Sequence, residues 1–177
     1  YFIVIFFSYL SGSIPFGLIL TKLITKKDIR KIGSGNIGAT NVLRTGNKYL
    51  AAATLILDII KGYVPIIIAK KYFPELIELS CVLAFLGHLF PIWLKFKGGK
   101  GVATYLGIIT ALSSHLCLLF VVTWLIVSLI FKYSSLSSMF ASLTVFVVNF
   151  LRETVISADA LLMSTIKVHD SKILFIF

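Results

Sequence analysis

Long apolar stretches separated by short polar connections make up most of this 177-residue chain. The clearest of them cover residues 1–20, 49–69, 76–94 and 102–130. About 20 apolar residues are enough to cross the hydrocarbon core of a bilayer, so each stretch is long enough to span a membrane. The pattern therefore predicts an all-α, polytopic integral membrane protein.

The second half of the chain predicts further spans. The apolar run at 102–131 is longer than one span needs, and a Ser-Ser-His sequence at 113–115 interrupts it. We therefore expect a short span followed by a full one, then two more at about 135–151 and 157–177. This gives about seven spans within one domain that covers residues 1–177.

Composition agrees with a membrane protein, because 58% of the residues are hydrophobic and soluble domains average about 45–50%. The two cysteines, Cys81 and Cys117, lie within apolar stretches, which argues against a disulfide framework or a metal site. We expect neither a metal nor a cofactor. No basic segment precedes the first apolar run, which argues against a cleaved signal peptide.

The net charge of +10 is concentrated in the short loops. Connections 22–48 and 95–101 lie two spans apart, so they are expected on one face of the membrane, and together they hold ten Lys and Arg. The connection between them, 70–78, holds two basic and two acidic residues. The positive-inside rule then places the two basic loops in the cytoplasm and the N-terminus outside. This rule accounts for the basic charge without nucleic acid as a partner.

The first basic loop contains GSGNIGATNVLRTG at residues 33–46. Its glycines allow consecutive backbone N–H groups to face one concavity, an arrangement that suits phosphate oxygens. Four neutral side chains would add donors, and Arg44 would supply a planar cationic fork. The alternative is an ordinary turn-rich loop. The predicted binding residues, besides Arg44, are Gly33, Ser34, Gly35, Asn36, Thr40 and Asn41.

The second basic loop belongs to GHLFPIWLKFKGGKGVAT, residues 87–104, and follows the same logic. Its glycines permit close backbone approach, Lys100 is a point charge for an anion, and Val102 opens a helix whose N-terminus would face that anion. The GxxxxGK[ST] spacing is absent, so a nucleotide is not implied. The predicted binding residues are Lys97, Gly98, Gly99, Lys100 and Gly101.

Three ionisable residues lie inside the predicted spans. His88 is either a hydrogen-bonded structural residue or a proton carrier or substrate donor. Asp58 and Lys61 are three residues apart on one helical face, where they can pair. We expect that pair to support helix packing, with Lys61 a lesser candidate for anion contact.

The sequence shows no Ser–His–Asp set, metal cluster or HxxxxD signature. The chemistry must therefore be one that phosphates and backbone dipoles can manage. Two phosphate-binding loops on one face suggest two phosphorylated substrates, at least one with an acyl chain in the bilayer.

Four segments resemble, in their order along the chain, the bacterial acyl-phosphate:glycerol-3-phosphate acyltransferases. They are SGSIPFG at 11–17, the first loop motif at 33–46, LDIIKG at 57–62 and the second loop motif at 87–104. The resemblance implies an all-helical, seven-span enzyme of the inner membrane with its active site at the cytoplasmic face. It implies that Ser34 and Arg44 match essential positions, that the second loop binds glycerol phosphate, and that His88 and Asn41 match invariant-looking positions.

The reaction implied by the resemblance joins the 1-hydroxyl of glycerol 3-phosphate to the acyl group of an acyl phosphate. The products are lysophosphatidic acid and inorganic phosphate, in the first step of phospholipid synthesis. Ser34, Arg44 and His88 are the catalytic candidates, and the enzyme that makes acyl phosphate is a candidate partner. Acyl-chain preference, the assignment of the two phosphates to the two loops, and the oligomeric state stay open.

The C-terminus departs from the family pattern, a His-x-x-Asn-Ile-x-Arg-Leu stretch followed by a Glu. His169 and Ile173 align with it, but Lys172 and Phe175 replace the Asn and the Arg, and the Glu is missing. A truncated or frameshifted tail would look like this over about the last ten residues. The tail leaves open a non-catalytic relic of the family. A transporter of phosphorylated metabolites is a separate alternative, since it too would use glycine-broken helices and basic residues.

Overall fold

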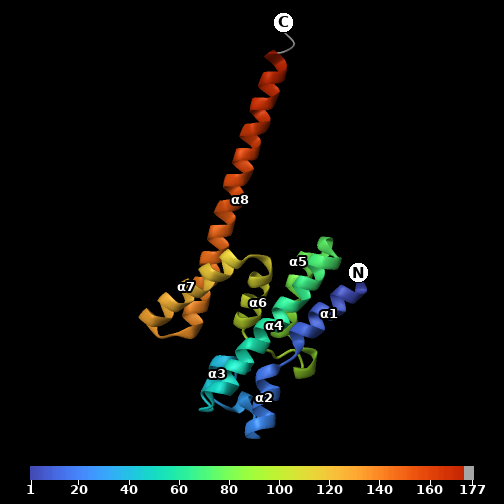
Figure 1. Ribbon diagram of the computed structural model, residues 1–177. Coiled ribbons are helices and arrows are strands. Elements are labelled where there is room, and N and C mark those ends of the chain that lie inside the picture. The colour runs from blue at the N-terminus through green and yellow to red at the C-terminus, as the bar shows by residue number, and fades with distance from the viewer. Residues whose placement is uncertain (174–177) are drawn as a thin grey trace. The chain divides into compact units, whose positions relative to one another are not determined.

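A computed structural model describes the backbone of residues 1–173 and the side chains of residues 1–158. All regular elements in this part of the chain are helices, which confirms the all-α prediction (Figure 1). The helices form two compact units, Tyr1–Leu118 and Leu119–Phe177. Both loop motifs lie in the first unit.

The first unit contains five longer helices, a short one and three 3₁₀ turns. They are α1 (Phe2–Ser13), α2 (Phe16–Thr25), η1 (Ile29–Lys31), α3 (Ala39–Leu43), α4 (Lys48–Tyr72), η2 (Pro74–Leu76), α5 (Ile77–Leu89), η3 (Ile92–Leu94) and α6 (Val102–Leu112). Two further helices follow, α7 (Ser114–Phe131) and α8 (Ser134–Ile173).

The described residues hold four segments that are long and apolar enough to cross a membrane. They are Lys48–Tyr72, Pro74–Leu94, Ser114–Phe131 and Ser134–Ala158. The pair α1 and α2, bent by 41° at a short break, makes a fifth if it counts as one span. A polytopic membrane protein is thus confirmed; the described residues hold four or five such segments, where the sequence predicted about seven in the whole chain.

Two features account for the difference in count. Helix α6 has 11 residues and is therefore about 16 Å long, roughly half the thickness of the hydrocarbon core. The spans predicted at 135–151 and 157–177 are joined, since α8 runs through Arg152 and Glu153 without interruption. Charged residues alone do not end a helix, and α8 contains neither glycine nor proline.

Helices α1 and α5 run side by side in the same direction and approach closely (Figure 1). Gly12 lies against the carbonyl of Ala84, where a β-carbon would have no room. One turn earlier, the buried hydroxyls of Ser8 and Ser80 hydrogen-bond at 2.8 Å. The small residues of the SGSIPFG segment thus allow both the close packing of α1 against α5 and the break after α1.

Helix α4 packs along α6 in a similar way. Gly62 lies against the carbonyl of Thr104, and Gly107 lies against the carbonyl of Ile59. At the far end of α6, Lys70 donates from Nζ to the carbonyl of Ala111 at 2.7 Å. Helix α4 is therefore a continuous central element against which shorter helices end.

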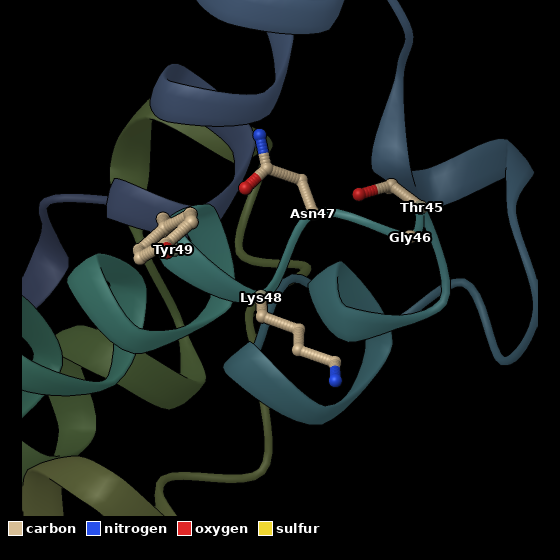
Figure 2. A pocket seen from close by; sticks show the side chains of 5 residues that line it. All are labelled: Thr45, Gly46, Asn47, Lys48 and Tyr49. Atoms are coloured by element: carbon tan, nitrogen blue, oxygen red, sulfur yellow. The ribbon is translucent and has the colours of Figure 1, made fainter.

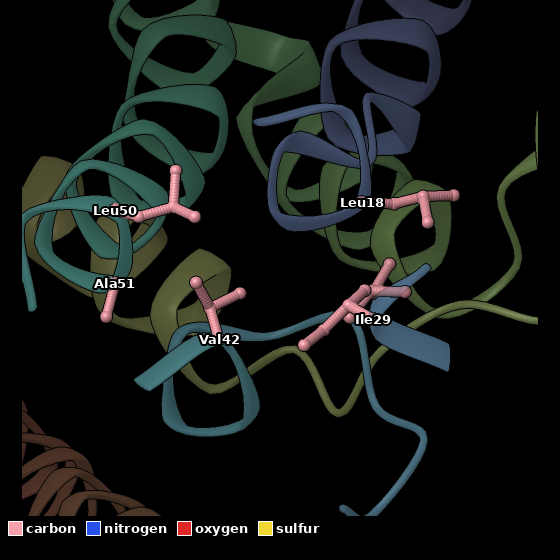
Figure 3. Packing of buried hydrophobic residues seen from close by; sticks show 6 residues of the cluster. Leu18, Ile29, Val42, Leu50 and Ala51 are labelled. Atoms are coloured by element: carbon pink, nitrogen blue, oxygen red, sulfur yellow. The ribbon is translucent and has the colours of Figure 1, made fainter. Parts of the chain in front are cut away.

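A hydrophobic cluster fixes the first basic loop to α2 and to the start of α4 (Figure 3). Its buried members are Leu18, Ile29, Ile37, Val42, Leu50 and Ala51. Leu94, from the connection after α5, packs against the same cluster. The connection that leads into the second loop therefore packs on the same cluster as the first loop.

Candidate active site

Asn41 organises the first loop. Its amide nitrogen donates to the carbonyls of Ile29, Ile32 and Asn36 at 3.1, 2.9 and 2.8 Å. Its amide oxygen accepts from the backbone N–H of Ser34 at 3.1 Å. The side chain is 3% exposed. Because its donors are used within the loop, Asn41 holds the loop in shape and has no N–H left for a phosphate, contrary to the prediction.

Arg44 lies across the glycine turn of the same loop. Gly33 has a φ of 53° and Gly35 a φ of 70°, both in the left-handed region that glycine adopts without strain. A β-carbon on Gly33 would lie 2.6 Å from Cδ of Arg44. The glycine therefore allows the Arg44 side chain to pass close to the backbone, with its guanidinium at the exposed surface.

The backbone concavity predicted for this loop is partly closed. The N–H of Ser34 bonds to Asn41, and the N–H of Gly35 donates to the carbonyl of Ile32 at 3.0 Å. The predicted donors that do reach the surface are side chains: Ser34, Thr40 and Arg44 are all exposed. Anion binding at this loop would thus depend on side chains more than on the backbone.

The second loop closes the C-terminal end of α5. Gly98 donates its N–H to the carbonyl of Leu89 at 3.0 Å, and Gly99 donates to that of His88 at 3.2 Å. These two N–H groups are therefore engaged within the chain rather than open to a phosphate. Lys97 and Lys100 remain exposed on either side of the two glycines.

Gly101 forms the N-cap of α6 with a φ of 79°. A β-carbon there would lie 2.5 Å from the ring of Phe85, so both the conformation and the space require glycine. The first turn of a helix has backbone N–H groups without intrahelical partners. Those of α6 therefore begin directly after Lys100, as the sequence predicted.

His88 lies under the second loop and not at its surface. The side chain is 3% exposed, and Nδ1 is 3.1 Å from Oγ1 of Thr104 in the first turn of α6. The Nε2 side of the ring lies against Gly99, leaving no space for a β-carbon. The imidazole thus joins the end of α5 to the start of α6.

Asp58 and Lys61 form the ion pair that their spacing predicted, with Nζ 2.8 Å from Oδ1. Both side chains are 3% exposed. Lys61 is therefore enclosed in the unit, and the anion contact suggested for it has no open path in this structure.

A short turn, Asp28–Arg30, opens the first loop. The Asp28 carboxylate accepts from the backbone and guanidinium of Arg30, with a shortest N–O distance of 2.7 Å. These hydrogen bonds lower the pKa of Asp28 from 3.8 to about 2. The carboxylate stays charged at neutral pH and neutralises Arg30, so this arginine contributes less to a cationic surface than Arg44 does.

An open depression of about 560 Å³ lies directly after Arg44 (Figure 2). Its lining residues are Thr45, Gly46, Asn47, Lys48 and Tyr49. Asn47 caps α4 by accepting from the N–H of Leu50 at 3.0 Å, while Tyr49 is 90% exposed. The sequence analysis did not single out this depression, although the Thr-Gly-Asn turn before a long apolar helix marks such a helix start.

Two further contacts were missed at sequence level. Thr104 belongs to the second motif, and its hydroxyl is the partner of His88. Trp93 donates from Nε1 to Oγ of Ser13 at 2.8 Å, which ties the connection after α5 to the end of α1. Neither contact follows from spacing, because each joins residues of different helices. No group of three or more metal-ligand side chains occurs among the described residues.

Comparison with known proteins identifies the family. A family model described as glycerol-3-phosphate acyltransferase matches residues 2–176. The chain belongs to this family. The resemblance drawn from the four motifs is thereby confirmed.

Glycerol-3-phosphate acyltransferases from several bacteria are similar to this chain. That of Pelagibacter ubique is 61% identical over 145 residues, which are 82% of this chain and 76% of the relative. That of Mesorhizobium japonicum is 58% identical over 139 residues, 78% of this chain and 71% of the relative.

The fold is also similar to that of a solved family member, PlsY (YgiH), an integral membrane glycerol 3-phosphate acyltransferase. Its glycerol 3-phosphate form aligns with a TM-score of 0.81 at 39% identity, over 85% of this chain and 76% of that one. Its lysophosphatidic acid form aligns with a TM-score of 0.79 at 38% identity. The atypical tail positions His169, Lys172, Ile173 and Phe175 lie outside the residues whose side chains the structure describes.

Proposed function

We propose that this protein transfers the acyl group of an acyl phosphate to the 1-hydroxyl of glycerol 3-phosphate. Lysophosphatidic acid and inorganic phosphate are the products, and the reaction is the first step of phospholipid biosynthesis. One observation carries the proposal beyond family membership. The loop that bears Arg44 and the turn that leads into the Lys100 loop pack on a single hydrophobic cluster, through Val42 and Leu94.

The charges of the two loops fit two phosphorylated substrates. Arg44 offers a planar fork for two phosphate oxygens, and Lys97 and Lys100 offer compact ammonium groups. Ser34 is exposed in the same loop as Arg44, and its hydroxyl is a neutral hydrogen-bond donor. The acyl chain of the donor would lie along the apolar helix surfaces, while its phosphate reaches the loops.

The chemistry requires proximity more than a nucleophile from the protein. The hydroxyl oxygen of glycerol 3-phosphate attacks the acyl carbonyl carbon, and the bond from that carbon to the phosphate oxygen breaks. An acyl phosphate is already an activated anhydride, so no covalent enzyme intermediate is needed. The loops would hold both substrates and stabilise the developing oxyanion.

The departing phosphate is the proposed acceptor of the hydroxyl proton. His88, the candidate among the ionisable residues, is enclosed between Thr104 and Gly99. The phosphate of the donor is bonded to the carbonyl carbon under attack, so its oxygens lie near the reacting hydroxyl. His88 therefore serves to place the second loop in this proposal.

The basic loops are proposed to face the cytoplasm of a bacterial inner membrane, with the N-terminus outside. Glycerol 3-phosphate would reach the loops from water, and acyl phosphate from the bilayer. The enzyme that makes acyl phosphate is a candidate partner, because an acyl phosphate hydrolyses unless it is used promptly. No metal or cofactor enters the scheme.

The experiment uses the full chain in liposomes with palmitoyl phosphate and glycerol 3-phosphate, and follows lysophosphatidic acid by mass spectrometry. We expect product only when both substrates are present, and none when palmitoyl-CoA replaces palmitoyl phosphate. Product from palmitoyl-CoA at a similar rate would overturn the donor assignment. Glycerol 3-phosphate binding without product would favour the relic, and uptake into the liposome lumen would favour the transporter.

A further inference from the structure

Lys61 lies near the middle of α4, beside the C-terminal end of α1. Its ammonium donates to the carbonyl of Ile14, the residue that caps α1, at 2.7 Å. Its own carbonyl accepts from the hydroxyl of Ser11 at 3.1 Å. Lys61 therefore binds the chain around the break between α1 and α2 twice, through its ammonium group and through its backbone carbonyl.

The surroundings of Lys61 leave it no room to bind a substrate. Asp58 pairs with its ammonium at 2.8 Å, and the ring of Phe16 lies 5.7 Å away, within range of a cation–π interaction. Both members of the ion pair are buried. Replacing a buried ion pair by apolar residues is often neutral for stability, so stability alone does not explain this arrangement.

One path leads from Lys61 to the first loop. Phe16 opens α2 directly after the break, and the next residue, Gly17, lies against the carbonyl of Ile37. Leu18 joins the hydrophobic cluster that contains Val42 of α3. Arg44 follows at the C-cap of α3. The position of the break thus determines where α2, and with it the Arg44 loop, is placed against α4.

A second path leads from the same point to the second loop. Gly62, the residue after Lys61, packs against the carbonyl of Thr104. The Thr104 hydroxyl bonds to His88, and the His88 ring supports Gly99. The two loops therefore take their positions from adjacent residues of α4.

We propose that Lys61, held by Asp58, is a positioning residue that sets the placement of the Arg44 loop relative to the Lys100 loop. The proposal rests on the proposed function for its catalytic consequence. A displacement of about 1 Å between reacting groups costs on the order of 100-fold in rate, so loss of this anchor should act on kcat. Neither Lys61 nor Asp58 touches a substrate in this account.

The test uses a double variant, Asp58→Asn with Lys61→Met, which removes both charges and leaves no buried charge unpaired. Lys70→Met is a matched control, because Lys70 makes an equal 2.7 Å bond to a helix-end carbonyl from the same helix, far from both loops. Lys61→Arg is a conservative variant that keeps a cation at this position. Each protein is assayed by phosphate release after its folding is checked by size exclusion and thermal unfolding.

We expect the double variant to fold, with kcat lowered about 10- to 100-fold and KM for glycerol 3-phosphate changed less than about threefold. Lys70→Met should keep kcat within about twofold of the wild type. Lys61→Arg should lower kcat less than the double variant does. A folded double variant with wild-type kcat would overturn the proposal. So would a double variant that does not fold, since the pair would then serve folding alone.

A second readout separates this proposal from the proposed function. Spin labels at Leu43→Cys and Lys97→Cys, in a chain whose native cysteines are replaced, report the distance between the loops. We expect one narrow distance distribution in the parent and a shifted or broader one in the double variant. If the distance distribution shifts but the wild-type protein shows no turnover, only the proposed function is contradicted. If the distribution is unchanged in the double variant, the positioning role is contradicted.

Discussion

The imidazole of His88 lies directly against Gly99, so closely that a β-carbon on Gly99 would overlap Nε2 of the ring. The backbone of the same two residues is joined as well, since the N–H of Gly99 donates to the carbonyl of His88 at 3.2 Å. The glycine that looks from sequence like a phosphate-binding element is therefore required by the side chain beneath it.

Gly99→Ala should lower activity strongly, because the added methyl group must displace either the ring or the second loop. We expect kcat/KM for glycerol 3-phosphate to fall at least about 10-fold, as expected for a misplaced binding loop. Gly38→Ala is the control, since a β-carbon there meets only the Asn36 amide at 4.0 Å. Adding His88→Ala to Gly99→Ala should restore part of the loss, and a lack of any recovery would show that the ring is not the obstacle.

His88→Ala alone distinguishes a supporting role from a catalytic one. Loss of a general base typically costs about 10²–10⁴-fold in kcat, whereas loss of a support for the loop should cost far less and should raise KM for glycerol 3-phosphate. Thr104→Val, which removes only the hydroxyl that bonds to His88, should shift KM in the same direction. A larger fall in kcat in a folded His88→Ala protein would restore the catalytic assignment.

Asn41→Asp should unfold the first loop more than Asn41→Ala does. The aspartate would turn an acceptor toward three carbonyls, whereas alanine only removes their donor. A buried polar group left without a partner costs about 1–3 kcal/mol, so loop amides should exchange about 5- to 150-fold faster in either variant. Hydrogen exchange of residues 28–47 measures this, and protection equal to the wild type would contradict the organising role of Asn41.

The turn that opens the first loop should survive to low pH. The pKa of Asp28 is lowered to about 2, below its ordinary 3.8, so the charged form favours the folded turn. That contribution is complete above about pH 4 and is lost as the pH falls from 4 towards 2. A carbon-13 titration of the Asp28 carboxyl in detergent checks this. A midpoint near 4 would show that Arg30 does not stabilise the charged carboxylate in solution.

Helix type, membrane class and family could be predicted from the sequence, because they depend on local properties. Apolar length predicted the spans, and the glycine motifs predicted the family. The spacing of Asp58 and Lys61 predicted their ion pair, since residues three apart share a helical face. The described segments differ from the predicted spans because α6 is short and because Arg152 and Glu153 do not interrupt α8.

The roles of individual loop residues could not be predicted in the same way. Glycines and an asparagine beside basic residues suggest phosphate binding, but the same residues build tight turns. Only the contacts show that Asn41 bonds to backbone carbonyls and that the N–H groups of Gly98 and Gly99 close α5. These partners come from the folding of a loop or from a neighbouring helix, which no periodic pattern reveals.

Phosphate release by wild type and Arg44→Ala, with palmitoyl phosphate and glycerol 3-phosphate, tests most directly whether the two loops form one acyl-transfer site. Arg44 is exposed, so its replacement should leave folding intact while removing the fork that we propose binds phosphate. We predict release by the wild type that needs both substrates and falls at least about 100-fold in Arg44→Ala. Release by Arg44→Ala at the wild-type rate would contradict the account, as would a folded wild type that releases no phosphate.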